Sequence, residues 1–226
     1  MKTDPENLCT LPEEPFARIA AQWRGPLEKY ARLLVEKNQV LNLVSRRQED
    51  LILPAHIFPC VAIGILLPFA DDSEVLDVGT GGGLPGIPLA IMFPKCHFTL
   101  LDSIGKKIHA VAEFVEKLGL RNVTTCQSRV ENLPPEKKFD VITGRAVTAL
   151  PQFLQWTWPR LRKTSNLHRG NSEPKPPVRG VIYLGGGTLA NNRHAPHLPP
   201  PQIFSLASHC RTSHGEGKWV AYFPKA

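Results

Sequence analysis

The feature that most constrains the fold of this chain is a glycine-rich turn between an apolar strand and an apolar helix. Residues 74–92 read E-V-L-D-V-G-T-G-G-G-L-P-G-I-P-L-A-I-M, with five glycines between the two apolar parts. A strand, a glycine turn and a helix in this order place backbone N–H groups and a helix N-terminus around a ligand. The stretch therefore predicts a ligand-binding turn after the first strand of an α/β sheet.

Two classes of ligand use such a turn. Gly81 to Gly86 matches G-x-G-x-x-G, and Asp102 follows at a suitable distance, so a dinucleotide is one candidate. The other is S-adenosylmethionine, whose ammonium group suits the acid Asp77, two residues before Gly79. A pyrophosphate would be repelled by that carboxylate. The residues favour S-adenosylmethionine and leave a dinucleotide-dependent oxidoreductase as an alternative.

Strands and helices alternate after the turn. The spacing of apolar residues predicts strands at 97–101, 123–126, 139–143, 180–184, 203–206 and 219–223, and helices at 104–118 and 147–161. This alternation predicts an α/β fold with a Rossmann-like, doubly wound, mostly parallel sheet. Residues 13–44 and 48–68 have helical spacing, with a predicted break at Gly25-Pro26. Residues 1–70 are therefore predicted to be a helical N-terminal extension, and 71–226 the ligand-binding domain.

Positive charge is concentrated in the last third of the chain. Residues 151–226 contain ten lysines and arginines against two acids, and five of the eight histidines. Such asymmetry favours a polyanionic partner, most simply a nucleic acid. Residues 163–179 are basic and residues 190–201 are rich in proline, which predicts a flexible insertion and a loop.

Several classes of protein are disfavoured. No apolar run approaches the length of a membrane helix, and the N-terminus has neither a signal-peptide nor a transit-peptide pattern. The five cysteines are scattered and lack C-x-x-C spacing, which predicts reduced thiols rather than disulfides or a metal site. We expect a soluble, cytoplasmic, monomeric protein.

Five motifs point to a family. They are L-N-L-V-S (41–45), V-L-D-V-G-T-G-G-G-L-P-G-I-P-L-A (75–90), F-T-L-L-D-S-I-G-K-K (98–107), Q-S-R-V-E (127–131) and F-D-V-I-T-G-R-A-V-T-A-L (139–150). Together they resemble the bacterial ribosomal RNA small subunit methyltransferase G family, also called glucose-inhibited division protein B. The resemblance implies a class I methyltransferase domain and S-adenosylmethionine as donor. It also implies methylation of N7 of a guanine in a loop of 16S rRNA, as naked RNA or in the small ribosomal subunit.

The resemblance and the glycine motif together give a set of predicted cofactor-binding residues. These are Asp77, Gly79, Gly81, Leu84, Asp102, Val130, Glu131 and Arg145. By resemblance, Gly79 and Leu84 would line the methionine and ribose, and Asp102 would accept hydrogen bonds from the ribose hydroxyls. Val130 and Glu131 would flank the adenine. Arg145 would lie beside the cofactor and the incoming base, and it is the predicted catalytic residue.

The implied chemistry agrees with the absence of an obvious general base. N7 of guanine has a lone pair and no proton, so its methylation needs alignment and exclusion of water. In A-form RNA N7 lies in a groove too deep and narrow for side chains, which predicts a loop or splayed base as target.

The chain departs from the family pattern in two places. The family usually has Arg/Lys-His-x-x-Asp-Ser where residues 55–60 read A-H-I-F-P-C, and it has L-K-G where residues 184–186 read L-G-G. His56 is kept. One interpretation is a rim residue that faces the cofactor pocket or RNA; the favoured one is a helix-end histidine satisfied by backbone. Because Gly185 replaces a lysine, a methyltransferase-like RNA-binding protein with weak or no turnover is a further alternative.

Overall fold

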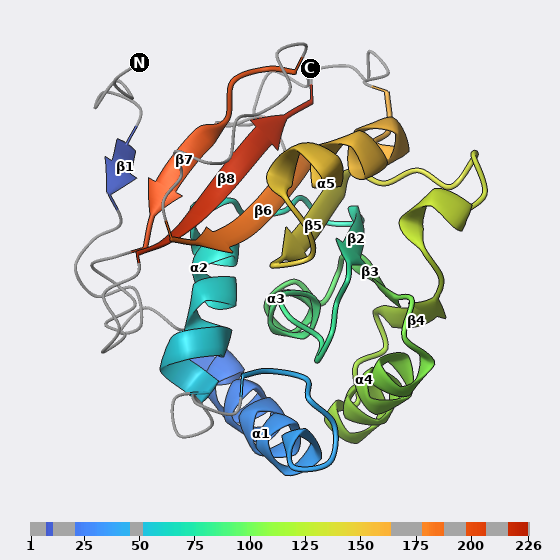
Figure 1. Cartoon of the computed structure of the whole chain (residues 1–226). Helices are drawn as coiled ribbons and strands as arrows, with labels where there is room; N and C mark the ends of the chain where they lie inside the picture. Colours follow the sequence, from blue (N-terminus) through green and yellow to red (C-terminus); the bar gives the residue numbers. More distant parts are fainter. Residues whose placement is uncertain are drawn as a thin grey trace.

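An eight-stranded sheet runs through the computed structural model, which describes residues 8–10, 21–45, 52–163, 178–187, 198–206 and 217–225 (Figure 1). The strands are β1 (Leu8–Thr10), β2 (Glu74–Val78), β3 (His97–Asp102), β4 (Val123–Gln127), β5 (Val141–Arg145), β6 (Gly180–Gly186), β7 (Gln202–Ser205) and β8 (Lys218–Pro224). Their order is β1-β7-β8-β6-β5-β2-β3-β4, and only β8 runs antiparallel to its neighbours. The predicted doubly wound, mostly parallel sheet is confirmed.

Helices cover both faces of the sheet. They are α1 (Ala21–Asn38), the π-helix η3 (Ile52–Ile57), α2 (Phe58–Leu66), α3 (Gly86–Met92), α4 (Gly105–Leu118), the 3₁₀-helix η4 (Val130–Asn132), α5 (Leu150–Thr157) and the 3₁₀-helix η5 (Trp158–Arg160). One apolar cluster joins α1, η3, α2, α3 and α4 to one face, and a second joins α5 and η4 to the other. The N-terminal helices thus lie on the same face as α3, which follows the glycine turn (Figure 1).

The central strands are mostly apolar because successive side chains point to opposite faces and both faces are buried. In β8, Val220 and Tyr222 join the cluster with α2, whereas Trp219, Ala221 and Phe223 join the cluster with α5. The amphipathic α4 ends where predicted, at Leu118, and Gly119 follows it in the left-handed conformation.

Several predicted boundaries are wrong. The helix is not broken at Gly25-Pro26, because α1 continues through Pro26. Leu27, Tyr30 and Leu34 are buried along one side of α1, and this packing outweighs the one backbone hydrogen bond that proline removes. The helix predicted at 147–161 begins only at Leu150. The strand predicted at 180–184 extends to Gly186, where it pairs with Lys218 of β8.

Parts of some predictions fall outside the described residues. These are 13–20 of the first predicted helical stretch, 48–51 of the second, 164–177 of the insertion and 190–197 of the proline-rich loop. Within the described chain, Cys60, Cys96 and Cys126 carry thiols and form no disulfide. No helix in the same part of the chain is long and apolar enough to cross a membrane.

Candidate functional site

Asp77, in β2, is the centre of the hydrogen bonds that shape the glycine turn. Its Oδ2 accepts from Thr80 Oγ1 at 2.6 Å and from the Gly86 backbone N–H at 3.0 Å, and its Oδ1 accepts from Thr143 Oγ1 at 3.0 Å. The side chain is 0% exposed, and this burial raises the pKa of Asp77 to about 6 although the hydrogen bonds act in the opposite direction. Asp77 therefore ties the turn to α3 and to β5.

The glycine turn is closely packed at Gly79 and less closely packed at Gly81. Gly79 and Gly81 have φ angles of +67° and +58°, which favour glycine. A Cβ at Gly79 would lie 2.8 Å from Val147 Cγ2, whereas a Cβ at Gly81 would meet nothing closer than 3.9 Å. The Gly81 N–H donates to Asp102 Oδ2 at 3.0 Å, and Asp102 Oδ1 accepts from the Ile104 N–H at 2.9 Å. The end of β3 is thereby fixed beside the turn.

The other predicted cofactor residues surround this edge of the sheet. Leu84 is buried within the turn, and Val130 is buried at the start of η4 in the same apolar cluster as Leu101 of β3. Glu131 is exposed, and its backbone carbonyl accepts from Arg160 Nη2 at 3.0 Å. The structure thus brings Asp77, Gly79, Gly81 and Asp102 together, while the roles of all eight residues toward a cofactor stay predictions.

Two polar residues of α1 support the site, and sequence reasoning missed both. The Tyr30 hydroxyl donates to the Gly82 carbonyl oxygen at 2.7 Å. Asn38 Oδ1 accepts from the N–H groups of Leu43 and Val44, each at 2.9 Å. Both side chains are fully buried. The helical spacing of this region predicts only packing against the core. The signals for the two hydrogen-bonding roles are a tyrosine on the apolar face of the helix and an asparagine at its end.

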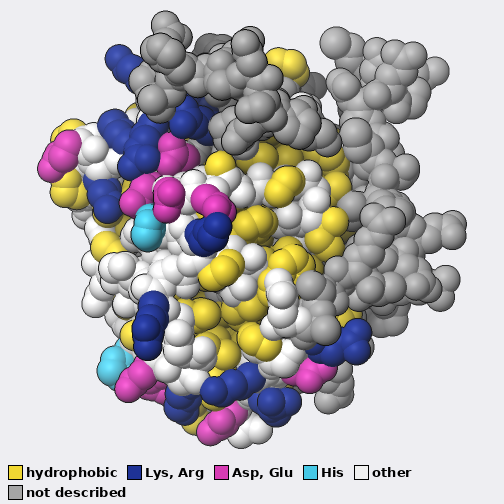
Figure 2. Space-filling model, turned by 180° about the vertical axis from the view of Figure 1, so that it is seen from behind, with side chains coloured by type: hydrophobic (Ala, Val, Ile, Leu, Met, Phe, Trp, Pro, Cys, Tyr) yellow, Lys and Arg dark blue, Asp and Glu magenta, His cyan; other side chains and the backbone are white. Residues whose placement is uncertain are grey.

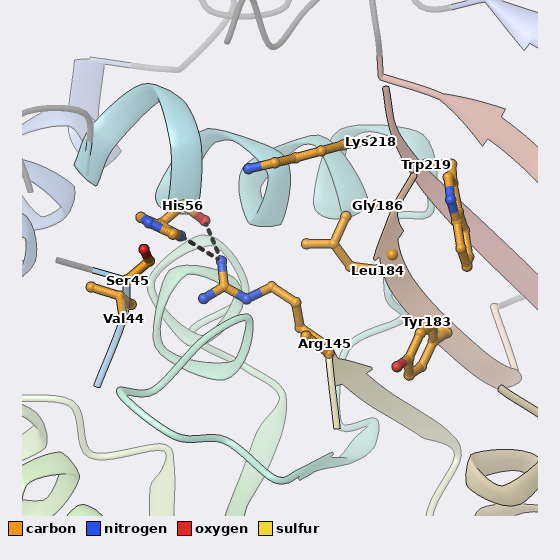
Figure 3. Close-up of a pocket in the computed structure, with 11 residues that line it drawn as sticks. Val44, Ser45, His56, Arg145, Tyr183, Leu184, Gly186, Lys218 and Trp219 are labelled. Carbon is orange, nitrogen blue, oxygen red and sulfur yellow. Dashed lines mark hydrogen bonds between the residues drawn. The ribbon is translucent and has the colours of Figure 1, made fainter. Parts of the chain in front are cut away.

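A pocket of about 470 Å³ opens next to the turn (Figure 3). Its lining includes Val44, Ser45, His56, Arg145, Lys218 and Trp219. The loop and strand ends that form it also touch the turn, because Val147 packs on Gly79 and the preceding residue, Ala146, lines the pocket. Ala146 has a φ of +51°, a conformation that is unfavourable for a residue with a side chain and is often found at functional sites. The pocket and the glycine turn therefore adjoin one another at the carboxyl edge of the parallel strands, where such sheets bind ligands.

Arg145 reaches across the pocket to His56. Its Nη1 lies 3.3 Å from His56 Nδ1 and 3.4 Å from the His56 carbonyl oxygen (Figure 3). Burial, Arg145 and Lys218 lower the pKa of His56 to about 3, so the imidazole is neutral at physiological pH. Since arginine can only donate, Nδ1 accepts and Nε2 carries the proton. Within the described chain, Nε2 is buried without a hydrogen-bond partner.

The interpretation of His56 as a histidine satisfied by backbone is therefore wrong. Its ring pairs with the guanidinium of Arg145, which follows from the approach of η3 to the end of β5. These segments are far apart in the sequence, and no local pattern indicates their contact.

Comparison with known proteins agrees with this arrangement. The family model for rRNA small subunit methyltransferase G matches residues 25–169. Two relatives called ribosomal RNA small subunit methyltransferase G come from Christiangramia forsetii and Flavobacterium psychrophilum. The first is 39% identical over 92% of this chain and 93% of its own length. The second is 36% identical over 87% of this chain and 88% of its own length.

Solved structures support the fold at lower identity. A candidate O-methyltransferase from Klebsiella pneumoniae has a TM-score of 0.54 at 16% identity and covers 93% of both chains. TrmN from Thermus thermophilus has a TM-score of 0.51 at 17% identity over 73% of this chain and 48% of its own. The family match spans the glycine turn, Asp102 and Arg145. This chain belongs to the rRNA small subunit methyltransferase G family.

Proposed function

We propose that this protein transfers a methyl group from S-adenosylmethionine to N7 of a guanine in 16S rRNA, acting in the cytoplasm as a monomer. The observation that carries the proposal is the pocket lined by Arg145, which adjoins the glycine turn through Ala146 and Val147. Family membership supports the donor and the class of RNA and disfavours the dinucleotide-dependent alternative.

The residues of the turn fit S-adenosylmethionine. A Cβ at Gly81 would meet only backbone oxygens, at 3.9 Å, and the Asp102 carboxylate, which is 6% exposed, can accept from the ribose hydroxyls. Asp77 is wholly buried and its oxygens accept from protein groups. We therefore assign Asp77 an indirect role toward the ammonium group, through its charge and the shape of the turn, rather than direct contact.

The pocket residues then hold the guanine for the reaction. When bound, S-adenosylmethionine supplies an electrophilic methyl group on a sulfonium centre. A bond forms between N7 and the methyl carbon as the carbon–sulfur bond breaks, and no proton moves. His56, with a pKa of about 3, is a poor proton acceptor at neutral pH, which fits a reaction that needs no base. Its ring and backbone carbonyl instead position Arg145.

Basic side chains elsewhere would add phosphate contacts. Figure 2 shows Lys and Arg side chains in an upper and a lower group on the rear face, interspersed with acids. Asp140 offsets part of the charge of two arginines. Its Oδ2 lies 2.8 Å from Arg162 Nη1, and its Oδ1 lies 3.8 Å from Arg179 Nε. Phosphate contacts of this kind give affinity without base selection.

The first experiment measures transfer of a labelled methyl group from S-adenosylmethionine to small ribosomal subunits and to their naked RNA. Both substrates come from cells that lack the modification, and already methylated subunits are the control. We expect label at N7 of a single guanine. Bound cofactor without transfer to either substrate would instead favour the RNA-binding alternative with weak or no turnover.

A Tyr30→Phe variant tests whether α1 supports the cofactor turn. Loss of the buried bond to Gly82 is expected to lower the free energy of unfolding by about 1–2 kcal/mol. It is also expected to weaken S-adenosylmethionine binding several-fold. Tyr222→Phe is the matched control, since the Tyr222 hydroxyl donates to the Arg179 carbonyl at 2.9 Å away from the turn. Urea denaturation and calorimetric titration give the two quantities. Equal cofactor affinity in both variants would contradict the prediction.

A further inference from the structure

The end of β6 has no room for a side chain at position 185. Gly185 lies opposite Trp219 of β8, and a Cβ on Gly185 would lie only 2.2 Å from Trp219 Cζ2. The indole is buried, and its Nε1–H donates to the Gly187 carbonyl at 3.2 Å. A lysine at this position would therefore displace a fixed ring. Trp219 accounts physically for the glycine that replaces the lysine of the family pattern.

The pocket nevertheless contains an ammonium group, which comes from β8. Lys218 pairs with Gly186 in the sheet and points to the face opposite Trp219. It lines the pocket with Arg145, and both side chains extend toward η3, the helix that carries His56 (Figure 3). Lys218 Nζ donates to the Ala55 carbonyl oxygen.

The altered segment at 55–60 explains how Lys218 is held. The Ala55 carbonyl accepts from Lys218, and the next carbonyl, that of His56, accepts from Arg145. Consecutive carbonyls of η3 thus contact the two cations. The two departures from the family pattern therefore lie beside the same pocket.

The positive charges of Lys218 and Arg145 suit a phosphate group better than a guanine ring. N7 methylation makes the guanine ring more positive, so cations placed against the ring would oppose the reaction. The phosphate of the same nucleotide keeps its negative charge throughout. No acidic residue is among the described residues that line the pocket. We propose that Lys218 and Arg145 bind the backbone phosphate of the target nucleotide, a proposal that rests on the proposed entry of RNA into this pocket.

The test compares Lys218→Gln, which keeps a donor for the Ala55 carbonyl but no charge, with wild type and with Lys218→Arg. Lys95→Met is the matched control, because it also removes one positive charge. Lys95 is exposed, precedes β3 in the chain, and has its Nζ 2.7 Å from Asp71 Oδ2. Binding of 16S rRNA is measured as a function of salt concentration, beside S-adenosylmethionine affinity and methyl transfer.

We expect Lys218→Gln to bind RNA about tenfold more weakly and to lower the slope of log K against log salt by about 0.7–0.9, the loss of one phosphate contact. Lys218→Arg and Lys95→Met should keep the wild-type slope. S-adenosylmethionine affinity should stay within about twofold in all variants, which also reports correct folding.

An unchanged slope in Lys218→Gln, or an equal fall in Lys95→Met, would overturn the assignment of Lys218. The proposed function is tested separately by methyl transfer in the wild type. If the wild type binds RNA with the expected slope but transfers no methyl group, the proposed function fails while the phosphate contact stands.

Discussion

Asp77→Ala is expected to lower the free energy of unfolding by about 3 kcal/mol, because it leaves three buried donors without their acceptor. The donors are the hydroxyls of Thr80 and Thr143 and the N–H of Gly86. Asp77→Asn is the informative partner, since its amide oxygen can still accept from the turn and Thr143 can act as acceptor for its NH₂ group. Asn should therefore keep the fold.

The asparagine variant also isolates an unusual pH dependence. Burial raises the pKa of Asp77 from 3.8 to about 6 in the folded protein, so the folded state binds this proton more tightly than the unfolded state. This tighter proton binding adds about 3 kcal/mol to the free energy of unfolding. The contribution is fully present below about pH 4 and is lost as the pH rises through about 6. Asp77→Asn should lack this fall.

Urea denaturation of the wild type and Asp77→Asn at several pH values between 4 and 7 measures the effect. Acids whose pKa is lowered by a partner, such as Glu113 beside Lys37, act in the opposite direction and are present in both proteins. The difference between the two curves therefore belongs to Asp77. Parallel curves would show that Asp77 titrates near its ordinary range. If its charge attracts the ammonium group, Asp77→Asn should also bind S-adenosylmethionine about tenfold more weakly.

The part of the site that could be predicted from sequence is the part built by neighbouring parallel strands. A strand, five glycines and a helix are local in the chain, and the carboxyl ends of β2 and β3 must meet at one edge. The contact between Gly81 and Asp102 follows from that topology. Apolar runs likewise indicated most of the described strands, because both faces of the sheet are covered.

The rest depends on contacts that no local pattern encodes. The three-residue β1 pairs with β7 from the other end of the chain, which short strands do not signal. Pro26 looked like a helix break, but the packing of α1 on the core decides otherwise. Lys218 enters the pocket only because β8 pairs antiparallel with β6 in a particular register. The sequence alone therefore does not predict the position of Lys218.

Asp102→Ala is expected to raise the dissociation constant for S-adenosylmethionine about 100-fold, close to 2.7 kcal/mol. The variant would lose hydrogen bonds from the ribose hydroxyls to a charged acceptor, which contribute more than neutral ones. It would also release the N–H groups of Gly81 and Ile104, so the turn and the start of α4 would be less well fixed. Asp102→Asn, which keeps one acceptor oxygen, should lose about tenfold.

Calorimetric titration measures the dissociation constant for S-adenosylmethionine in each variant. The matched control is Glu131→Ala, which removes an exposed carboxylate in the neighbouring η4. Glu131→Ala should change the affinity less than about threefold, because an exposed group contributes little. At saturating cofactor, Asp102→Ala should still methylate RNA, since Asp102 acts on cofactor binding and does not line the pocket that contains Arg145. Wild-type affinity in Asp102→Ala would mean that the ribose does not lie at the end of β3. The cofactor would then have to run the other way along the sheet edge, and Arg145 would no longer lie beside the target nucleotide.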